Sequence, residues 1–292
     1  MVLNVIIATR NRSANLRDLL EGLLRCEVSL AYKWDVWVID NNSTDDTPQI
    51  VQFLASQHPN RIHYRSEPAQ GKSFALNRGI RESSGDIVIF TDDDCIPDVH
   101  WIENIGREFS TRPDLGIVGG RIELYNPLDK PLTIRTWTDR RILTSASDLF
   151  FFIAGCNMAV RRDVLTSVGD FDTRLGPGSP KDTVAEDPDF IYRALRMGTK
   201  IEYVPEVLVH HNHGRKSESD AKILNRKYMR GRGAFYAKHI LKGDSTILKL
   251  AYWEFRSIAV SFFRNLVSRK PVSEEWFALR CLMAGMTSRL TG

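Results

Sequence analysis

Apolar and polar stretches alternate regularly over the first third of the chain. Residues 2–8, with the sequence VLNVIIA, form a nearly continuous apolar run, which is typical of a strand buried on both faces of a parallel sheet. Further strands are expected at residues 34–39, 61–65 and 86–91. Each of these segments is short and is followed by a polar stretch, so the pattern predicts buried strands joined by helices and turns.

The segments between these strands have the spacing of helices. Five leucines within residues 13–25 recur at helical intervals, a polar turn at residues 41–48 leads into a second helix, and Gly71 opens a third. Strand and helix in alternation predict an α/β fold of the Rossmann-like kind, with a mostly parallel sheet flanked by helices.

The pattern becomes less regular after residue 115. From about residue 216 onward it is helical and basic, so we expect a domain over residues 1–215 and a helical C-terminal region over 216–292. Between them the expected elements are a strand at 116–125, a polar loop with a helix at 126–150, a strand or strand pair at 151–162, a helix at 183–197 and one or two strands at 200–211.

Composition and charge narrow the class of protein. The chain has 292 residues, of which 42% are hydrophobic and 26% are charged, which is ordinary for a globular protein. A net charge of +4 suits phosphate-bearing substrates or an anionic membrane surface, and alone it does not indicate a nucleic-acid partner. No apolar stretch approaches the roughly 20 residues of a spanning helix. Four scattered cysteines without a CxxC pair favour a reducing cytoplasm.

Three polar clusters follow predicted strands directly: residues 9–12, 40–42 and 92–94. Ligands of open α/β sheets bind beyond the carboxyl ends of the strands, so we expect one site near all three clusters. In the third cluster, Asp92 and Asp94 point to the same side of an extended segment and can share one hard divalent cation, such as Mg²⁺ or Mn²⁺, or one sugar–phosphate. A solvated acidic turn is the alternative interpretation.

A second acidic cluster, Glu186, Asp187 and Asp189, begins a predicted helix. The partial positive charge of a helix N-terminus favours carboxylates there and could account for all three. The functional alternative is a general base that takes the proton of an attacking sugar hydroxyl.

Two further candidate site features are basic side chains, a run of histidines and a lysine. His210, His211 and His213 lie within four positions, and one of them could complete a metal site because neutral imidazole binds first-row metals such as manganese. A surface cluster is the alternative. Lys72 stands at a helix start after Gly71, where a phosphate or ribose contact is natural.

Taken in order, these segments resemble the family 2 glycosyltransferases, which have the GT-A fold. The resemblance covers about three quarters of the chain, and it rests on VIIATRNR, VIDNNSTDDT, AQGKSFALNRGI, DIVIFTDDDC, GCNMAVRRDVLTSVGDFDTRLG, AEDPDFIYRALRMG and YVPEVLVHHNH. It implies a transferase that moves a sugar from a nucleoside-diphosphate sugar to a hydroxyl acceptor, either a glycan or a lipid-linked sugar. A role in polysaccharide biosynthesis is a further expectation.

The resemblance also implies roles for the donor-side residues. Thr9 and Asp40 match positions that contact the base and ribose of the nucleotide, and Lys72 matches a nucleotide-side contact. Asp92 matches the first acid of the DxD motif, near the ribose, and Asp93 is assigned to the same nucleotide-sugar site.

For the metal and the chemistry, the resemblance implies that Asp94 holds Mn²⁺ or Mg²⁺ against the diphosphate, with His211 reaching the metal. Because the chain has a third acid and a second nearby histidine, Asp93 and His213 stay open as alternative ligands. Asp187 matches the catalytic base of the ED motif, with Glu186 beside it. The implied reaction is a single displacement that inverts the anomeric carbon.

The helical region contains one segment of mixed character. Residues 247–267 combine large apolar side chains with lysines and arginines, which is typical of a helix lying on an anionic membrane. Packing on the catalytic domain or on a second subunit is the alternative, and the oligomeric state is open. We therefore expect a cytoplasmic protein, and peripheral contact at the inner face of the membrane stays open beside the packing alternative.

Three other functions compete with this interpretation. A nucleotidyltransferase usually has a glycine-rich loop after the first strand, whereas this chain has ATRNRSAN there. A retaining transferase would differ in the stereochemistry of its product. A catalytically silent glycan-binding module would be expected to have lost acids at the DxD or ED positions, and both are intact.

Overall fold

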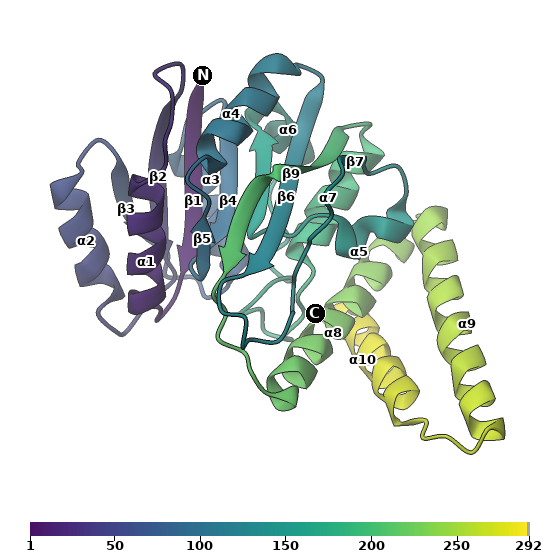
Figure 1. Cartoon of the computed structure of the whole chain (residues 1–292). Coiled ribbons are helices and arrows are strands. Elements are labelled where there is room, and N and C mark those ends of the chain that lie inside the picture. Colours follow the sequence, from purple (N-terminus) through teal and green to yellow (C-terminus); the bar gives the residue numbers. More distant parts are fainter. Residues whose placement is uncertain (291–292) are drawn as a thin grey trace.

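The computed structural model describes residues 1–290 and contains a nine-stranded sheet flanked by helices (Figure 1). In chain order the elements are β1 (Val2–Thr9), α1 (Ser13–Leu24), β2 (Lys33–Asp40), α2 (Thr47–Gln57), β3 (Ile62–Ser66), α3 (Lys72–Glu82), β4 (Ile87–Asp92), β5 (Cys95–Pro97), α4 (Trp101–Thr111), β6 (Leu115–Leu124), β7 (Arg141–Ile142), the 3-10 helix η1 (Ala146–Asp148), α5 (Leu149–Phe152), β8 (Asn157–Arg161), α6 (Arg162–Val168), α7 (Glu186–Arg196), β9 (Lys200–His211), α8 (Glu218–Ile240), α9 (Ser245–Val267) and α10 (Ser273–Leu290). The predicted α/β class, with a central sheet flanked by helices and a helical C-terminal region, is confirmed.

The first four long strands form the parallel half of the sheet, in the order β3-β2-β1-β4. Their register aligns the carboxyl ends: Thr9 lies opposite Asp40, and Ala8 lies opposite Asp92. The polar clusters that follow β1, β2 and β4 therefore meet at one edge of the sheet, as the strand pattern predicts.

The second half of the sheet is mixed rather than mostly parallel. Strand β8 runs antiparallel to both β4 and β6, while β6 and β9 are parallel. The short β5 pairs antiparallel with the end of β9, which places Cys95 opposite His211. This pairing brings the end of the acidic triplet beside the histidine run, although Asp94 and His211 are 117 positions apart in sequence.

Two hydrophobic cores cover the two faces of the sheet. Helices α1, α2 and α4 contribute to one core, with Leu16, Val51 and Trp101 among its buried residues. Helices α3, α6, α7 and α8 contribute to the other, with Leu76 and Phe190 among its buried residues. Burial on both faces explains why the central strands are apolar runs rather than alternating ones.

Two expectations from the sequence were incomplete or wrong. The pattern did not indicate α4 or α6, and the strand expected over residues 151–162 begins only at Asn157. Phe151 and Phe152 end a short helix instead, and the Phe152 ring packs near Trp137, with ring centroids 6.0 Å apart. A short apolar run cannot be assigned to strand or helix by periodicity alone.

The C-terminal helices pack against the sheet domain and against one another. Helix α10 crosses α8 so closely that a Cβ at Gly285 would lie 1.9 Å from the Arg230 carbonyl oxygen, and a Cβ at Gly233 would lie 2.1 Å from the Leu282 carbonyl oxygen. Helix α9 lies at the edge of the molecule far from β3 (Figure 1). Within residues 1–290, no helix is long and apolar enough to cross a membrane. The division at residues 215 and 216 stays a prediction.

Candidate active site

The ends of β1, β2 and β4 place three predicted site residues together. The Thr9 hydroxyl donates to Asp93 Oδ2 at 2.8 Å. Asp40 is buried, and its carboxylate accepts from the Ser43 backbone N–H at 3.0 Å and from the Tyr64 hydroxyl at 3.0 Å. These bonds hold Asp40 and Asp93 in fixed orientations at the sheet edge.

Sequence reasoning missed Asn41, which shapes the loop before α3. Its side-chain carbonyl accepts from the Gly71 N–H at 2.8 Å, and its amide donates to the carbonyl oxygens of Glu67 at 3.1 Å and Ala69 at 2.6 Å. A buried amide with these partners fixes the path of residues 67–71 and so the start of α3. The signal was available, since Asn directly after a buried strand is typical of a side chain that bonds loop backbone.

Lys72 at the first position of α3 joins two acidic clusters. Its Nζ lies 2.5 Å from Asp92 Oδ1 and 3.7 Å from Glu186 Oε1. Burial lowers the pKa of Lys72, but the carboxylates of Asp92, Asp187 and Glu186 outweigh burial and raise this pKa well above its ordinary value. Lys72 is therefore a permanent cation between the strand end and α7.

Glu186 and Asp187 occupy the first turn of α7 and are both enclosed. Burial and the charge of Asp187 raise the pKa of Glu186 to about 8, and burial raises the pKa of Asp187. Asp187 Oδ2 accepts from the Gly155 N–H at 2.9 Å, whereas Oδ1 is buried with no hydrogen-bond partner. A Cβ at residue 155 would lie 2.3 Å from the carboxylate, so only glycine fits there.

Asp94 and His211 form a buried pair, with Asp94 Oδ1 and His211 Nε2 3.2 Å apart. Burial opposes the charged forms, but the hydrogen bond between them lowers the pKa of Asp94 to about 2 and raises the pKa of His211 to about 8. Arg12 Nη1 lies 3.7 Å from the other Asp94 oxygen. Asp94 is thus an ionised carboxylate that faces the Arg12 guanidinium and the His211 ring.

His213 and Asp93, the alternative metal ligands, differ from this pair in the hydrogen bonds that their polar atoms make. His213 Nε2 bonds the Lys130 carbonyl oxygen at 3.0 Å, and its Nδ1 accepts from the Arg215 N–H at 3.0 Å, so both ring nitrogens have partners. Burial and the charge of Asp94 raise the pKa of Asp93 to about 7, and one Asp93 oxygen is bonded to Thr9.

A divalent metal fits the side chains of this region. Asp94, Cys95 and His211 form a buried group whose potential ligand atoms all lie within 4.8 Å of one another. The Asp94 carboxylate and the His211 imidazole are an oxygen and a nitrogen donor, a combination that suits Mn²⁺. The pKa of the Cys95 thiol is raised well above its ordinary value by its hydrogen bond to Cys156 and by burial.

The predicted residues therefore lie in three linked groups at one edge of the sheet. Thr9 joins Asp93, Lys72 joins Asp92 to Glu186 and Asp187, and Asp94 joins His211. Asp40 lies on the neighbouring strand end, in register with Thr9. The arrangement offers cations for a phosphate-bearing ligand, carboxylates for a metal and a buried carboxylate for proton transfer.

Comparison with known proteins agrees with this arrangement. Residues 4–169, more than half of the chain, match the family described as Glycosyl transferase family 2, and residues 87–288 match Glycosyl transferase family group 2. Glycosyltransferase AglE of Haloferax volcanii is 28% identical over 237 residues, which is 79% of this chain and 72% of that protein.

Other curated relatives are longer than this chain. The probable glycosyltransferase YdaM of Bacillus subtilis is 26% identical over 70% of the chain, and the beta-monoglucosyldiacylglycerol synthase of a Nostoc species is 26% identical over 65% of it. The chain covers only 49% and 40% of these two proteins, respectively.

Solved structures show the same fold. The mannosyltransferase PcManGT from Pyrobaculum calidifontis, in complex with GDP-Man and Mn²⁺, aligns over 99% of this chain and 87% of its own, with a TM-score of 0.66 and 21% identity. Residues 1–349 of S. aureus TarS in complex with UDP align over 99% of this chain and 82% of that one, with a TM-score of 0.64 and 18% identity. The fold is GT-A, and the chain belongs to glycosyl transferase family 2 and is a glycosyltransferase.

Proposed function

We propose that this enzyme moves a sugar from a nucleoside-diphosphate sugar to a hydroxyl group of a glycan or lipid-linked acceptor, with inversion at the anomeric carbon. The observation that carries the proposal is Asp187: a half-buried carboxylate with one buried, unpartnered oxygen, linked through Lys72 to the Asp92 strand end. The donor class is supported by PcManGT, solved with GDP-Man, and by TarS, solved with UDP-GlcNAc.

The donor would bind along the carboxyl ends of the parallel strands. Thr9 and Asp40 stand where a base and ribose would contact β1 and β2, and Asp92 and Asp93 stand at the end of β4. Lys72 carries its charge at the N-terminus of α3, where backbone N–H groups and the helix dipole also favour an anion. This position supports a contact to the nucleotide.

Asp94 and His211 would hold Mn²⁺ or Mg²⁺ beside the donor. His211 supports this role better than His213, because both nitrogens of His213 already have protein partners. Asp94 supports it better than Asp93, because Asp94 lies in one group of potential ligands with His211, whereas Asp93 is bonded to Thr9. A bound divalent cation neutralises charge that develops on a leaving diphosphate.

Asp187 would act as the general base toward the acceptor hydroxyl. Its raised pKa makes it a stronger base than an ordinary aspartate, and the Gly155 N–H orients one oxygen while leaving Oδ1 available. Glu186, whose pKa is raised by burial and by the charge of Asp187, stands beside it and would hydrogen-bond the acceptor. A hydroxyl deprotonated in this way attacks the anomeric carbon in one displacement, which inverts it.

Thermal unfolding with nucleotides tests the donor and metal assignments. We expect one of UDP, GDP or dTDP to raise the melting temperature in the presence of Mn²⁺, since a ligand at one hundred times its Kd stabilises a protein by about 2.7 kcal/mol. Asp94→Ala should abolish the metal-dependent part of the shift. Asp18→Ala, which removes an exposed carboxylate from α1, should leave it unchanged.

One outcome would contradict the donor assignment. If none of the three nucleotides shifts the native protein under any metal condition, the site does not bind a nucleotide, and the silent glycan-binding module becomes the better interpretation.

We further propose that α9 contacts an anionic membrane from the cytoplasmic side. The helix exposes a row of large apolar side chains: Leu248, Tyr252, Trp253, Val260, Phe263, Leu266 and Val267. Exposed cations lie among and beyond them at Arg256, Arg264, Arg269 and Lys270. Apolar area together with positive charge is what an interfacial helix requires. A cytoplasmic location fits the cysteines, which form no disulfide within residues 1–290.

Liposome flotation tests this contact. The native chain should float with anionic liposomes at low salt, and the double variant Trp253→Ser with Phe263→Ser should bind about tenfold more weakly, because two large apolar side chains no longer leave water. Phe53→Ser, at an exposed phenylalanine of α2, is the matched control and should bind normally. Absence of binding at low salt would end the membrane interpretation and favour packing of α9 against a second subunit.

A further inference from the structure

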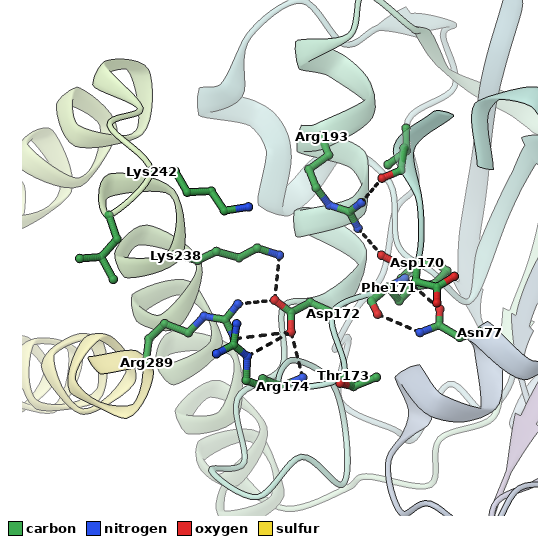
Figure 2. Close-up of a pocket in the computed structure, with 12 residues that line it drawn as sticks. Asn77, Asp170, Phe171, Asp172, Thr173, Arg174, Arg193, Lys238, Lys242 and Arg289 are labelled. Atoms are coloured by element: carbon green, nitrogen blue, oxygen red, sulfur yellow. Dashed lines mark hydrogen bonds and ion pairs between the residues drawn. The ribbon is translucent and has the colours of Figure 1, made fainter. Parts of the chain in front are cut away.

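A second polar pocket lies away from the predicted donor residues, between the loop that precedes α7, the end of α8 and the end of α10 (Figure 2). Its volume is about 780 Å³, which is within the usual range for small-molecule sites. Arg174, Arg193, Lys238, Lys242 and Arg289 line it, with only Asp170 and Asp172 as acids. We call this the basic pocket.

The acids of the basic pocket do not balance its cations. Asp170 is 61% exposed and is paired with Arg81, which does not line the pocket. Asp172 alone receives Lys238 Nζ at 2.8 Å, Arg174 Nε at 3.7 Å and the Arg289 guanidinium. The lining therefore carries five cationic groups against two carboxylates, a surplus of three positive charges.

A carboxylate beneath the pocket removes only part of this surplus. Asp189 pairs with Lys238 Nζ at 2.7 Å and with Arg193 Nε at 3.0 Å. Lys242, exposed near the end of α8, has no ion pair among residues 1–290. Figure 2 shows Lys238 of α8, and Lys242 just after this helix, extending toward the side on which Arg193 of α7 lies.

Helix electrostatics explain only some of these cations. The C-terminal end of a helix favours positive charge, which accounts for Lys238 in the last turn of α8 and for Lys242 just after it. It also accounts for Arg193 and Arg289, in the last turns of α7 and α10, but not for Arg174, which comes from a loop. Cations that converge from separate elements on one concave surface are typical of a site for a multiply charged anion.

We propose that the basic pocket binds a phosphate-bearing ligand, either a soluble phosphate or diphosphate compound or a phosphate headgroup at a membrane. Arg174 and Lys242 would contact the phosphate at the pocket entrance, because both are exposed. Lys238 and Arg289 would add positive charge deeper in the pocket. This proposal does not depend on the donor site, which lies at the other end of α7, where Glu186 and Asp187 are.

Inorganic pyrophosphate and phosphatidate vesicles are the two probes. Calorimetry and thermal unfolding are carried out on the full chain in EDTA, so that no metal-bound anion occupies the donor residues. We expect pyrophosphate to stabilise the native chain, and Lys242→Gln or Arg174→Gln to weaken its binding about three- to tenfold, since each removes one charged contact. Asp94→Ala should bind pyrophosphate like the native chain.

Lys33→Gln, which removes an exposed lysine at the start of β2, is the matched control and should bind both probes like the native chain. If pyrophosphate has no effect but phosphatidate vesicles bind and Lys242→Gln releases them, the ligand is a lipid headgroup and the proposal stands. If neither probe binds, or if both pocket variants bind like Lys33→Gln, the basic pocket is not a phosphate site.

Discussion

Replacing Asp187 by asparagine is expected to lower kcat about a thousandfold while leaving the fold and nucleotide binding intact. Positioned general bases contribute roughly a hundredfold to ten-thousandfold to rate. The substituted amide would preserve the size of the side chain, and its oxygen could still accept from the Gly155 N–H, but it could not take a proton. The measurement is steady-state turnover together with nucleotide-induced thermal stabilisation of the same preparation.

The pH profile adds a second test of the same carboxyl. Because burial raises the pKa of Asp187 above its ordinary value, the ionised base is lost as the pH falls through this raised pKa. The kcat of the native enzyme should therefore decline on the acid side, and the small residual rate of Asp187→Asn should lack that decline.

Asp163→Asn, at an exposed carboxylate in the first turn of another helix, α6, is the matched control and should retain full activity. Retention of more than about a tenth of native turnover by Asp187→Asn would contradict the base assignment. A product with the anomeric configuration of the donor would contradict inversion.

The position of the site could be predicted from the sequence because it depends on strand ends. Thr9, Asp40 and Asp92 each end or directly follow an apolar run, and parallel strands bring such positions to one edge. The acids at the start of α7 could also be predicted, because the helix dipole favours carboxylates at a helix N-terminus. Local pattern and general sheet geometry were enough for these residues.

Other features depend on partners distant in sequence and could not be predicted in this way. The sequence does not show which histidine is free to bind a metal. The structure does, because backbone groups of the loop at residues 126–132 and of Arg215 occupy both ring nitrogens of His213. Asp93 is set apart from its neighbours by Thr9, 84 residues earlier. The basic pocket needs α10 to lie across α8, and no local pattern contains that packing.

The roles of the acids at the start of α7 could not be predicted from the sequence either, although these acids lie within four residues of one another. Asp187 is a half-buried and Asp189 a fully buried carboxylate at the start of one helix, and the sequence does not separate their roles. The structure turns Asp187 toward Gly155 and leaves one of its oxygens unpaired. The Asp189 carboxylate instead faces α8, where it meets Lys238 and His239.

Replacing Asp189 by asparagine is expected to destabilise the fold by about 3–5 kcal/mol, as removal of one partner from a buried charge cluster commonly does. Asp189 accepts from Arg193 at 3.0 Å, Lys238 at 2.7 Å and His239 at 3.0 Å, so its loss leaves Arg193 without its carboxylate and Lys238 with Asp172 alone. Urea unfolding at neutral pH measures the change. Asp170→Asn, which breaks the exposed pair with Arg81, is the control and should cost less than about 1 kcal/mol.

The contribution of Asp189 should also depend on pH in a defined direction. Burial raises the pKa of Asp189, but the hydrogen bond from His239 and the charges of Lys238 and Arg193 outweigh it and lower the pKa from 3.8 to about 2. Since the folded pKa lies below the unfolded one, the stabilisation is complete above pH 3.8 and is lost as the pH falls toward 2. The difference between native and Asp189→Asn proteins should therefore shrink over that interval. A difference that stays constant over that interval would mean that the ionised form of Asp189 does not supply the stabilisation.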